Sequence, residues 1–306
     1  MPENAVYWVD QSVMNSGNGS MGSPFELISE ALALIPNGQA GTIKVKKAGT
    51  YEQVQIGQLK TVAILGVNAP VFESDFDTIV VAGGATVFVD GVIVSAGGSN
   101  GVSCINSAVW ISDSEISLNG ARGVLGNVCD MHVLRSRIVR NVQGALRAID
   151  GEVVISNSFV GGDTNNQTAV IVEGAVDAEV IYSTLAMGYG TATVLSCVNG
   201  NGEGVSVRNS ILVAATDGAE ISGCDSAQFA TTVTESGALG TMGVGSMDIS
   251  WFFDFGVADF HLTANAPDEI STAATWQTGD PKTDIDGHAR PTTDGTPDYA
   301  GADVPN

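Results

Sequence analysis

The sequence predicts an all-β protein folded as a right-handed parallel β-helix, on three observations: an internal repeat, short strand-like segments, and abundant turn residues. Periods of roughly 20 to 50 residues are typical of units that bury their faces only by stacking. The chain has 38 glycines in 306 residues, which indicates many turns because glycine adopts positive φ without steric cost. Apolar residues make up 44% of the chain, enough for a substantial core, so disorder is not expected.

The repeat consists of two columns of residues spaced 21 to 26 positions apart. The small or amide column contains Gly91, Ser114, Ser136, Asn157, Ser183 and Asn209. Two residues later, the apolar column contains Ile93, Ile116, Ile138, Phe159, Leu185 and Ile211. In stacked coils the first column would form a hydrogen-bonded ladder and the second a continuous core. No helical pattern separates the units, which excludes a sheet built of alternating strands and helices.

A capping helix is predicted at the N-terminal end of the solenoid. Ser23-Pro24-Phe25-Glu26 combines an N-cap serine, a proline at the first helical position and a glutamate three residues after the cap. The helix would run to about Ile35, with its apolar face formed by Leu27, Ile28, Ala31, Leu32 and Ile35. An open apolar end of a solenoid needs such a cover.

The C-terminal end is expected to be irregular. The aromatic run Trp251 to Phe255 predicts a plug for the last coil, with a sugar-stacking platform as the alternative. We expect one structural domain overall. Its parts would be an N-terminal strand and capping helix over 1–42, parallel coils over 43–235, and a C-terminal cap and tail over 236–306.

The charge balance limits the partners. Acidic residues outnumber basic ones by 34 to 12, for a net charge of −22. Such a surface repels nucleic acid and anionic membranes, so no nucleic-acid partner is expected. A polyanionic polysaccharide would need a bridging cation, which makes calcium a candidate cofactor. No apolar run approaches the ~20 residues that span a bilayer, so no membrane insertion of this chain is expected.

Both ends of the chain carry distinctive segments. The N-terminal part contains Val6-Tyr-Trp-Val-Asp10 and a Ser-Pro-Phe-Glu-Leu-Ile segment, and the tail contains Asp284-Ile-Asp-Gly-His-Ala-Arg290-Pro. With these segments the chain resembles secreted bacterial β-helix proteins of the pectin-lyase-like superfamily, and its tail is similar to the Asp-x-Asp-Gly-x-x-Arg-Pro ending of surface-anchored members. The resemblance implies a secreted or cell-surface protein, although the first residues carry no export signal. The superfamily includes lyases, hydrolases and adhesins, so the resemblance does not assign a reaction.

Five arginines gather within 26 positions of this acidic chain: Arg122, Arg135, Arg137, Arg140 and Arg147. In β-helix lyases an arginine or lysine removes a proton beside a carboxylate, so Arg135, Arg137 and Arg140 are the catalytic candidates. Arg122, Arg135, Arg137 and Arg147 are the binding candidates. The repeat also stacks Arg135 on Asp113 and Arg137 on Glu115, and we favour this structural pairing.

Acidic residues alternate at Glu73, Asp75 and Asp77, so an extended stretch would present all three carboxylates on one side as a candidate calcium site. A solvated loop is the favoured alternative. Asp284-x-Asp286-Gly287 matches only the start of a calcium loop, and Arg290 is expected to pair with Asp284 or Asp286 instead.

The four cysteines predict disulfides in an exported protein. Cys197 and Cys224 align on adjacent coils, within reach of a bridge. Cys104 and Cys129 fit less well because the repeat places Cys104 opposite Gly126, and buried thiols are an equal alternative. His132, His261 and His288 are isolated in the sequence, which predicts no histidine-based site.

The sequence therefore favours a non-catalytic extracellular β-helix module for carbohydrate contact, adhesion or structural spacing. The alternative is a polysaccharide lyase or glycoside hydrolase that uses the long strand face as its groove, with calcium as a candidate cofactor.

Overall fold

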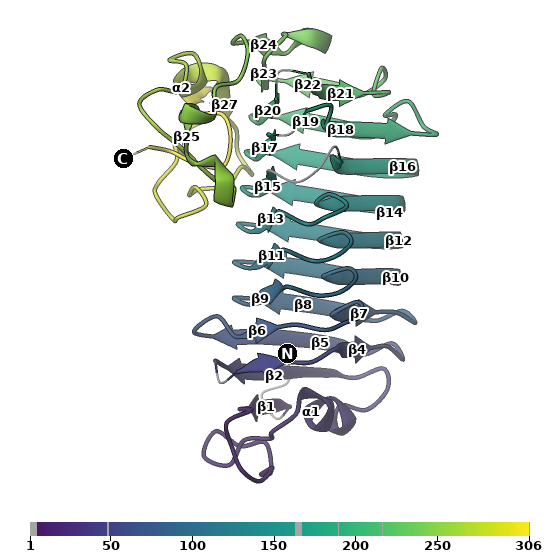
Figure 1. Ribbon diagram of the computed structural model, residues 1–306. Coiled ribbons are helices and arrows are strands. Elements are labelled where there is room, and N and C mark those ends of the chain that lie inside the picture. The colour runs from purple at the N-terminus through teal and green to yellow at the C-terminus, as the bar shows by residue number, and fades with distance from the viewer. Residues whose placement is uncertain (1–4, 48, 163–166, 189, 216, 306) are drawn as a thin grey trace.

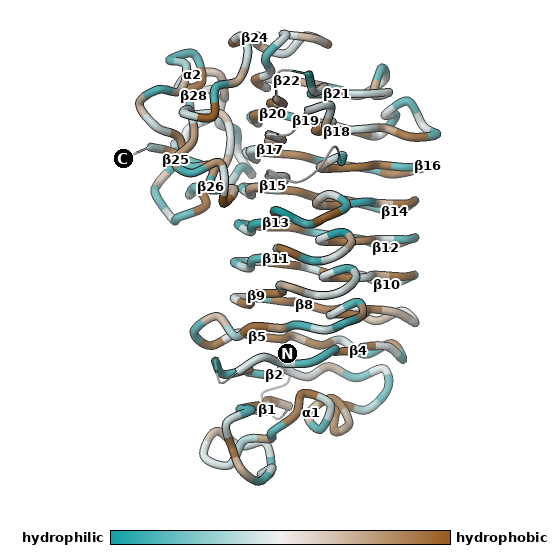
Figure 2. Tube along the Cα trace, in the orientation of Figure 1, coloured by the Kyte–Doolittle hydropathy of each residue, from teal (hydrophilic) through white to brown (hydrophobic). Residues whose placement is uncertain are grey.

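The protein folds as a right-handed parallel β-helix, as the sequence predicts. The structure is a computed structural model, and it describes residues 5–47, 49–162, 167–188, 190–215 and 217–305. Its strands stack in chain order along one axis, from the N-terminal end to β24 (Figure 1). Hydrophobic residues recur along the stacked strands (Figure 2), because each coil buries the inward-pointing side chains of its strands.

Two parallel sheets form the walls of the helix. In the described residues, the larger is a 14-stranded sheet that we call the long sheet. Its strands are β1 (Val6–Val9), β2 (Ala40–Lys46), β4 (Val54–Ile56), β5 (Thr61–Val67), β7 (Ile79–Val81), β8 (Thr86–Asp90), β10 (Val102–Ser112), β12 (Val124–Leu134), β14 (Leu146–Ser156), β16 (Thr168–Ile181), β18 (Thr193–Val198), β19 (Val205–Arg208), β21 (Ala219–Ser222) and β22 (Gln228–Ala230).

The second wall, which we call the short sheet, contains ten strands of two to four residues in the described chain. They are β3 (Thr50–Tyr51), β6 (Val71–Phe72), β9 (Ile93–Ser95), β11 (Glu115–Ser117), β13 (Arg137–Val139), β15 (Phe159–Gly162), β17 (Thr184–Met187), β20 (Ile211–Ala214), β23 (Val233–Thr234) and β24 (Met242–Gly243).

A tight turn connects the long sheet to the short sheet in each coil. The turn residues include Asp113, Arg135 and Asn157, with φ of 48°, 43° and 54°. Asn and Asp tolerate this left-handed conformation better than most residues, because their side chains can hydrogen-bond locally. Arginine has no such advantage, but Arg135 is held in the turn by its backbone N–H, which donates to Ser156 O at 3.1 Å.

The serine ladder is real, but its register differs from the predicted one. Ser158 and Ser210, not Asn157 and Asn209, continue the column of Ser114, Ser136 and Ser183. Each backbone N–H donates to the hydroxyl of the next coil at 3.1 to 3.2 Å. The prediction was wrong there because Asn157 and Asn209 occupy the left-handed turn one residue earlier.

The same shift of one residue affects the apolar column. Ile116 and Ile138 stack on Val94 and Val160, not on Ile93 and Phe159. Likewise Leu185 stacks on Leu212 and not on Ile211. Successive side chains of a strand point to opposite faces, so the displaced residues Ile93, Phe159 and Ile211 lie on the outer face of the short sheet.

The N-terminal cap contains α1 (Ile28–Leu34), which begins later than predicted. Phe25 is extended and pairs with β1 through its backbone, donating to Trp8 O and accepting from Asp10 N. Ser23 is therefore not the N-cap. The Glu30 carboxylate instead accepts from the Leu27 N–H at 3.0 Å. Ile28, Ala31, Leu32 and Ile35 bury against the first coils, but Leu27 is exposed, contrary to prediction.

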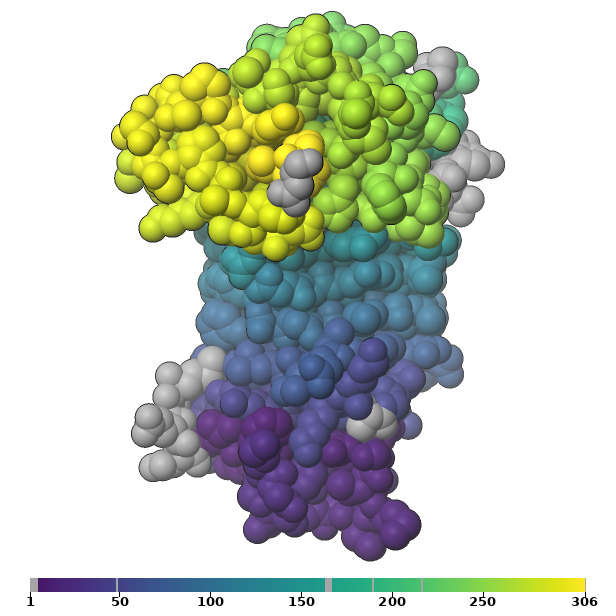
Figure 3. All heavy atoms as spheres, turned by 90° about the vertical axis from the view of Figure 1, so that its left-hand side faces the viewer, coloured from purple at the N-terminus to yellow at the C-terminus, as the bar shows by residue number. Residues whose placement is uncertain are grey.

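The C-terminal cap does not plug the last coil. It lies along the outer face of the short sheet, over its later strands (Figure 1), and leaves the earlier coils of that face uncovered (Figure 3). Within the cap region, η1 (Ala238–Gly240) contacts β22 at the end of the coils. The elements that follow are η2 (Ile249–Trp251), β25 (Phe252–Asp254), η3 (Phe255–Val257), β26 (Asp259–Leu262), α2 (Ile270–Ala273), β27 (Ala274–Trp276) and β28 (Thr296–Asp298).

The aromatic run contributes to a second hydrophobic core between the cap and the short sheet. Trp251, Phe252 and Phe255 pack in one cluster with Phe159 and Ile211. The predicted plug is therefore wrong in its location, because the rings bury their apolar surface against the outward residues Phe159 and Ile211. Phe253 points to solvent and is 75% exposed.

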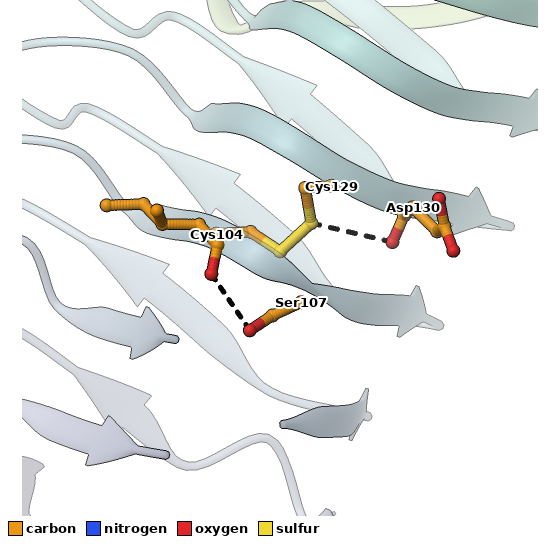
Figure 4. The surroundings of a disulfide bond; sticks show 5 residues. Cys104, Ser107, Cys129 and Asp130 are labelled. Atoms are coloured by element: carbon orange, nitrogen blue, oxygen red, sulfur yellow. Dashed lines mark hydrogen bonds between the residues drawn. A yellow bond between two sulfur atoms is a disulfide. The ribbon is translucent and has the colours of Figure 1, made fainter. Parts of the chain in front are cut away.

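Both predicted disulfides are present. Cys197 and Cys224 bridge adjacent coils with a Cα–Cα distance of 5.0 Å. Cys104 pairs in register with Gly126, as expected. Its sulfur nevertheless bonds to that of Cys129, which lies further along the neighbouring strand β12 (Figure 4), and the two Cα atoms are 6.0 Å apart. Among the described helices, none is long and apolar enough to cross a membrane.

Candidate functional site

A column of rings runs along the outer face of the long sheet. Phe88, Trp110 and His132 occupy equivalent positions of β8, β10 and β12. The ring centroids of Phe88 and Trp110 lie 5.0 Å apart, and those of Trp110 and His132 lie 4.7 Å apart with an interplanar angle of 4°. Because the spacing between coils lies within the range of centroid separations of stacked rings, the fold itself aligns them.

The column continues with shorter side chains. Val154 of β14 follows His132 in register, and Glu179 and Ser206 follow Val154. Beyond His132 the column drops from a ring to a valine, and two neighbouring hollows are both lined by Val154 and Glu179. We call this surface, from Phe88 to Ser206 with its two hollows, the trough.

One side of the trough is acidic. Asp130, Glu152 and Asp177 form an exposed row in register on β12, β14 and β16. The row lies two residues before the ring column on each strand, so both point outward. This acidic row concentrates negative charge along one edge of the trough.

The other side of the trough is closed by the C-terminal cap. Pro281, Lys282 and Thr283 line a hollow of about 360 Å³ together with Arg135 and Arg208. The Asn157 amide nitrogen donates to Thr283 O at 2.9 Å, which fixes this cap segment against the turn that connects the long sheet to the short sheet. The hollow therefore exists only because the cap lies beside the long sheet.

Both arginines of this hollow are engaged by carboxylates. Arg135 forms a two-pronged pair with Asp113, with Nε and Nη2 at 2.9 and 2.6 Å from the two carboxylate oxygens. The pair is the predicted one, and hydrogen bonding to Asp113 raises the pKa of Arg135. Arg208 contacts the buried Asp280 and lies 3.8 Å from Glu179.

His132 is the titratable member of the ring column. Burial lowers its pKa, and the charges of Glu152 and Asp130 only partly oppose this effect. The neutral imidazole is therefore the favoured form in the stack, which keeps the column uncharged.

The other predicted catalytic arginines lie elsewhere. Arg137 is on the outer face of the short sheet, where it donates to the carbonyls of Val257 and Ala258 at 3.3 and 3.2 Å. It is in register with Glu115, as predicted, but the expected ion pair does not form among the described residues: Arg137 holds the cap, and Glu115 accepts from the Ser117 hydroxyl. Arg140 occupies the left-handed turn after β13 and forms no ion pair within the described residues.

Arg122 and Arg147 form a separate pair of cations near the start of the long strands. Arg147 contacts the carboxylate of Glu173. Burial, followed by the charge of Arg147, lowers the pKa of Arg122. The structure thus distributes the five arginines over three surfaces, and it does not gather the predicted binding set into one site.

The predicted calcium ligands do not converge either. Residues 73–77 bend after β6, so the alternation expected of an extended strand is lost. Asp77 Oδ1 accepts from the Ser99 hydroxyl and the Asn100 backbone and side-chain N–H groups. Glu73 and Asp75 line a different, open hollow. Among the described residues, these three carboxylates do not form a cluster with metal-binding spacing.

The tail motif is a structural clamp. Arg290 is 3% exposed and pairs with Asp298 at 3.1 Å, not with Asp284 or Asp286 as predicted. It also donates to Gly301 O at 2.7 Å and lies 4.2 Å from the centroid of the Tyr182 ring. Asp284 cannot serve as its partner because its oxygens already accept from the N–H groups of Asp286, His288 and Val304.

The trough residues were missed because each histidine and aromatic residue was considered singly. Phe88, Trp110 and His132 are spaced by 22 residues, which is the spacing of the serine ladder. Applying the repeat period to rings would have found the column, and His132 is not isolated in the folded chain.

Comparisons with known proteins identify the fold. No family model and no curated protein matches the sequence. Among solved structures, the chain is similar to the crystal structure of pectate lyase Pel9A, with a TM-score of 0.53 and 14% identity. The match covers 97% of this chain and 96% of that one. The protein therefore shares the parallel β-helix fold along its whole length with this pectate lyase.

Proposed function

We propose that this protein is an extracellular β-helix module that binds a neutral polysaccharide along the trough without cleaving it. One observation carries the proposal: the ring column leads into hollows lined by Val154, carboxylates and hydroxyl groups. Ligand sites typically join apolar surface to a few placed polar groups. A linear glycan matches this arrangement because its subunits repeat along one direction, as the coils do.

Charge favours a neutral glycan over a polyuronate. Asp130, Glu152, Asp177 and Glu179 are exposed along the trough, whereas Arg135 and Arg208 are already paired. The surface thus repels a polyanion and leaves carboxylate oxygens to accept hydrogen bonds from sugar hydroxyls.

The pairing of the arginines also supports a role without catalysis. A lyase base must be able to accept a proton, and Arg135 is held by Asp113 while Arg137 holds the cap. The second candidate, a polysaccharide lyase or glycoside hydrolase with calcium as a cofactor, is favoured by the likeness to pectate lyase Pel9A, which at this identity concerns the fold.

An extracellular or cell-surface location fits the covalent structure. All four cysteines are paired, and disulfides persist mainly in oxidising compartments. Four free thiols in protein isolated from its native source under non-reducing conditions would contradict this location.

Binding is tested by calorimetry and affinity electrophoresis with neutral glucans and xylans against polygalacturonate, each with and without calcium. We expect binding to a neutral glycan, weakened about tenfold or more by Trp110→Ala and by Glu179→Gln. Glu26→Gln, a change of a partly exposed carboxylate in the N-terminal cap, is the matched control and should bind normally. Release of unsaturated uronides from polygalacturonate would overturn the proposal in favour of the lyase.

A further inference from the structure

The C-terminal cap contains a cluster of ligating side chains remote from the trough. His261 lies in β26, and Asp286 and Asp303 come from the tail. One ligating atom from each of the three lies within 4.8 Å of the others. His261, which is isolated in the sequence, gains acidic neighbours because the tail folds back onto β26.

The imidazole of His261 is held in a defined orientation. Its Nδ1 contacts the carboxylate of Asp259, two residues earlier on the same strand. Its Nε2 lies 2.7 Å from Asp286 Oδ2, and yet this buried atom makes no hydrogen bond with the described residues. His261 Nε2 and Asp286 Oδ2 are therefore close enough to share a ligand, although they are not oriented for a hydrogen bond to each other. A histidine that donates Nδ1–H to a carboxylate and presents Nε2 is the usual arrangement of a metal ligand.

Asp303 supplies a second buried ligand. The residue is only 4% exposed, and among the described residues its one hydrogen-bond donor is the Leu262 N–H, 2.7 Å from Oδ2. A buried carboxylate with a single neutral donor is costly unless a positive charge lies nearby. The His261 imidazole lies among three carboxylates, with Nδ1 against Asp259, Nε2 2.7 Å from Asp286 Oδ2, and Asp303 in the same cluster, so this position attracts positive charge.

The cluster is accessible from solvent. His261, Asp286 and Asp303 line a hollow of about 430 Å³ at the surface of the cap, together with Tyr299. Three protein ligands beside an open hollow leave room for water to complete a coordination shell.

We propose that His261, Asp286 and Asp303 bind a divalent first-row transition-metal ion, with Asp259 as the positioning residue for the imidazole. One nitrogen and two carboxylate ligands suit Zn²⁺, Fe²⁺ or Mn²⁺, whereas Ca²⁺ takes oxygen ligands. The ion would tie β26 to the C-terminal tail. This site is independent of the proposed glycan binding.

A second cluster, formed by Asp284, Asp286 and His288, is the less suitable site. Asp284 is fully buried, and its two oxygens accept from three backbone N–H groups and contact His288 Nδ1 at 3.0 Å. Its lone pairs are therefore already used, and the residue acts as the scaffold that presents Asp286.

The test is titration of untagged, chelator-treated full-length protein with Zn²⁺ and Mn²⁺, followed by calorimetry and thermal unfolding. We expect one ion per chain and a metal-dependent rise in Tm, with Ca²⁺ binding much more weakly. His261→Gln and Asp303→Asn should each weaken binding about a hundredfold or more, and Asp259→Asn about 10- to 100-fold. Nitrogen hyperfine coupling in the electron paramagnetic resonance of bound Mn²⁺ should disappear in His261→Gln.

His288→Gln is the discriminating control, because it alters the neighbouring cluster and leaves the three proposed ligands intact. Normal affinity in this variant supports the site. Loss of binding in His288→Gln with retention in His261→Gln would overturn the assignment. Absence of stoichiometric binding by the folded wild-type protein would show that His261 and Asp286 form only an ion pair.

Discussion

The outer face of the short sheet differs sharply between its early and late coils. One column runs in register from Ile93 through Glu115 and Arg137 to Phe159, Thr184 and Ile211. The first three are partly exposed, but Phe159, Thr184 and Ile211 are completely buried. The change coincides with the edge of the C-terminal cap (Figure 3). One structural position of the repeat thus belongs to the surface in one half of the molecule and to a core in the other.

This contrast teaches that the repeat determines the inner core, whereas the cap determines which outer residues are apolar. A residue on an outer face is free to be charged until a second layer covers it. The trough shows an intermediate case, because its ring column is half-buried by neighbouring rings and remains open above them.

The largest effect is expected from a substitution in the region that the C-terminal cap covers. Phe159→Ala should destabilise the protein by about 3–5 kcal/mol, because it leaves a cavity between the short sheet and Phe260, whose ring centroid lies 5.7 Å away. Phe88→Ala on the open face should cost less than half as much. Guanidinium unfolding of both variants measures the difference, and equal losses would show that the cap does not form a true core.

A smaller effect is expected from the clamp that holds the cap. Arg290→Lys keeps the charge but cannot reproduce the planar fork that reaches Asp298 and Gly301, so we expect a loss of about 2–3 kcal/mol. Limited proteolysis should cut the tail of this variant faster than that of the wild type. Exposed Arg135→Lys is the control, and an equal loss there would refute the special role of burial at Arg290.

The smallest effect is expected from protonation of His132, which lies on the uncovered outer face of the long sheet. Burial lowers the pKa of His132 in the folded state, so below about pH 6.5 the unfolded chain binds more protons at this residue. The folded state therefore loses stability as pH falls from about 7 to about 5. His132→Gln should lose less stability than the wild type over this range, as measured by Tm at both pH values. Parallel losses would indicate that the stacked imidazole does not resist protonation.

The inner ladder and the Cys197–Cys224 disulfide were predictable because they follow the coil period, whereas Cys104 lies in register with Gly126 and its bridge to Cys129 was left open against buried thiols. Ser114, Ser136 and Ser183 mark the ladder through their spacing alone, and Cys197 and Cys224 follow the same rule. The errors of one residue at Asn157 and Asn209 arose because insertions change the spacing locally, and only the left-handed turn fixes the register.

The site residues were less predictable for a different reason. The arginines were grouped by proximity in sequence, yet a turn after every few residues sends Arg135, Arg137 and Arg147 to different faces. Conversely His261 and Asp303 are 42 residues apart in the sequence (303 − 261) and come together in the cap, which has no repeat to reveal their contact.

The sequence by itself determined the parallel β-helix, its period and the Cys197–Cys224 bridge, because similar surroundings in every coil require similar residues at regular intervals. Only the tertiary structure decided where the C-terminal cap lies, which outer face it buries and which polar side chains it gathers. Those outcomes depend on one irregular segment packing on one surface, and such an interaction leaves no periodic pattern in the chain.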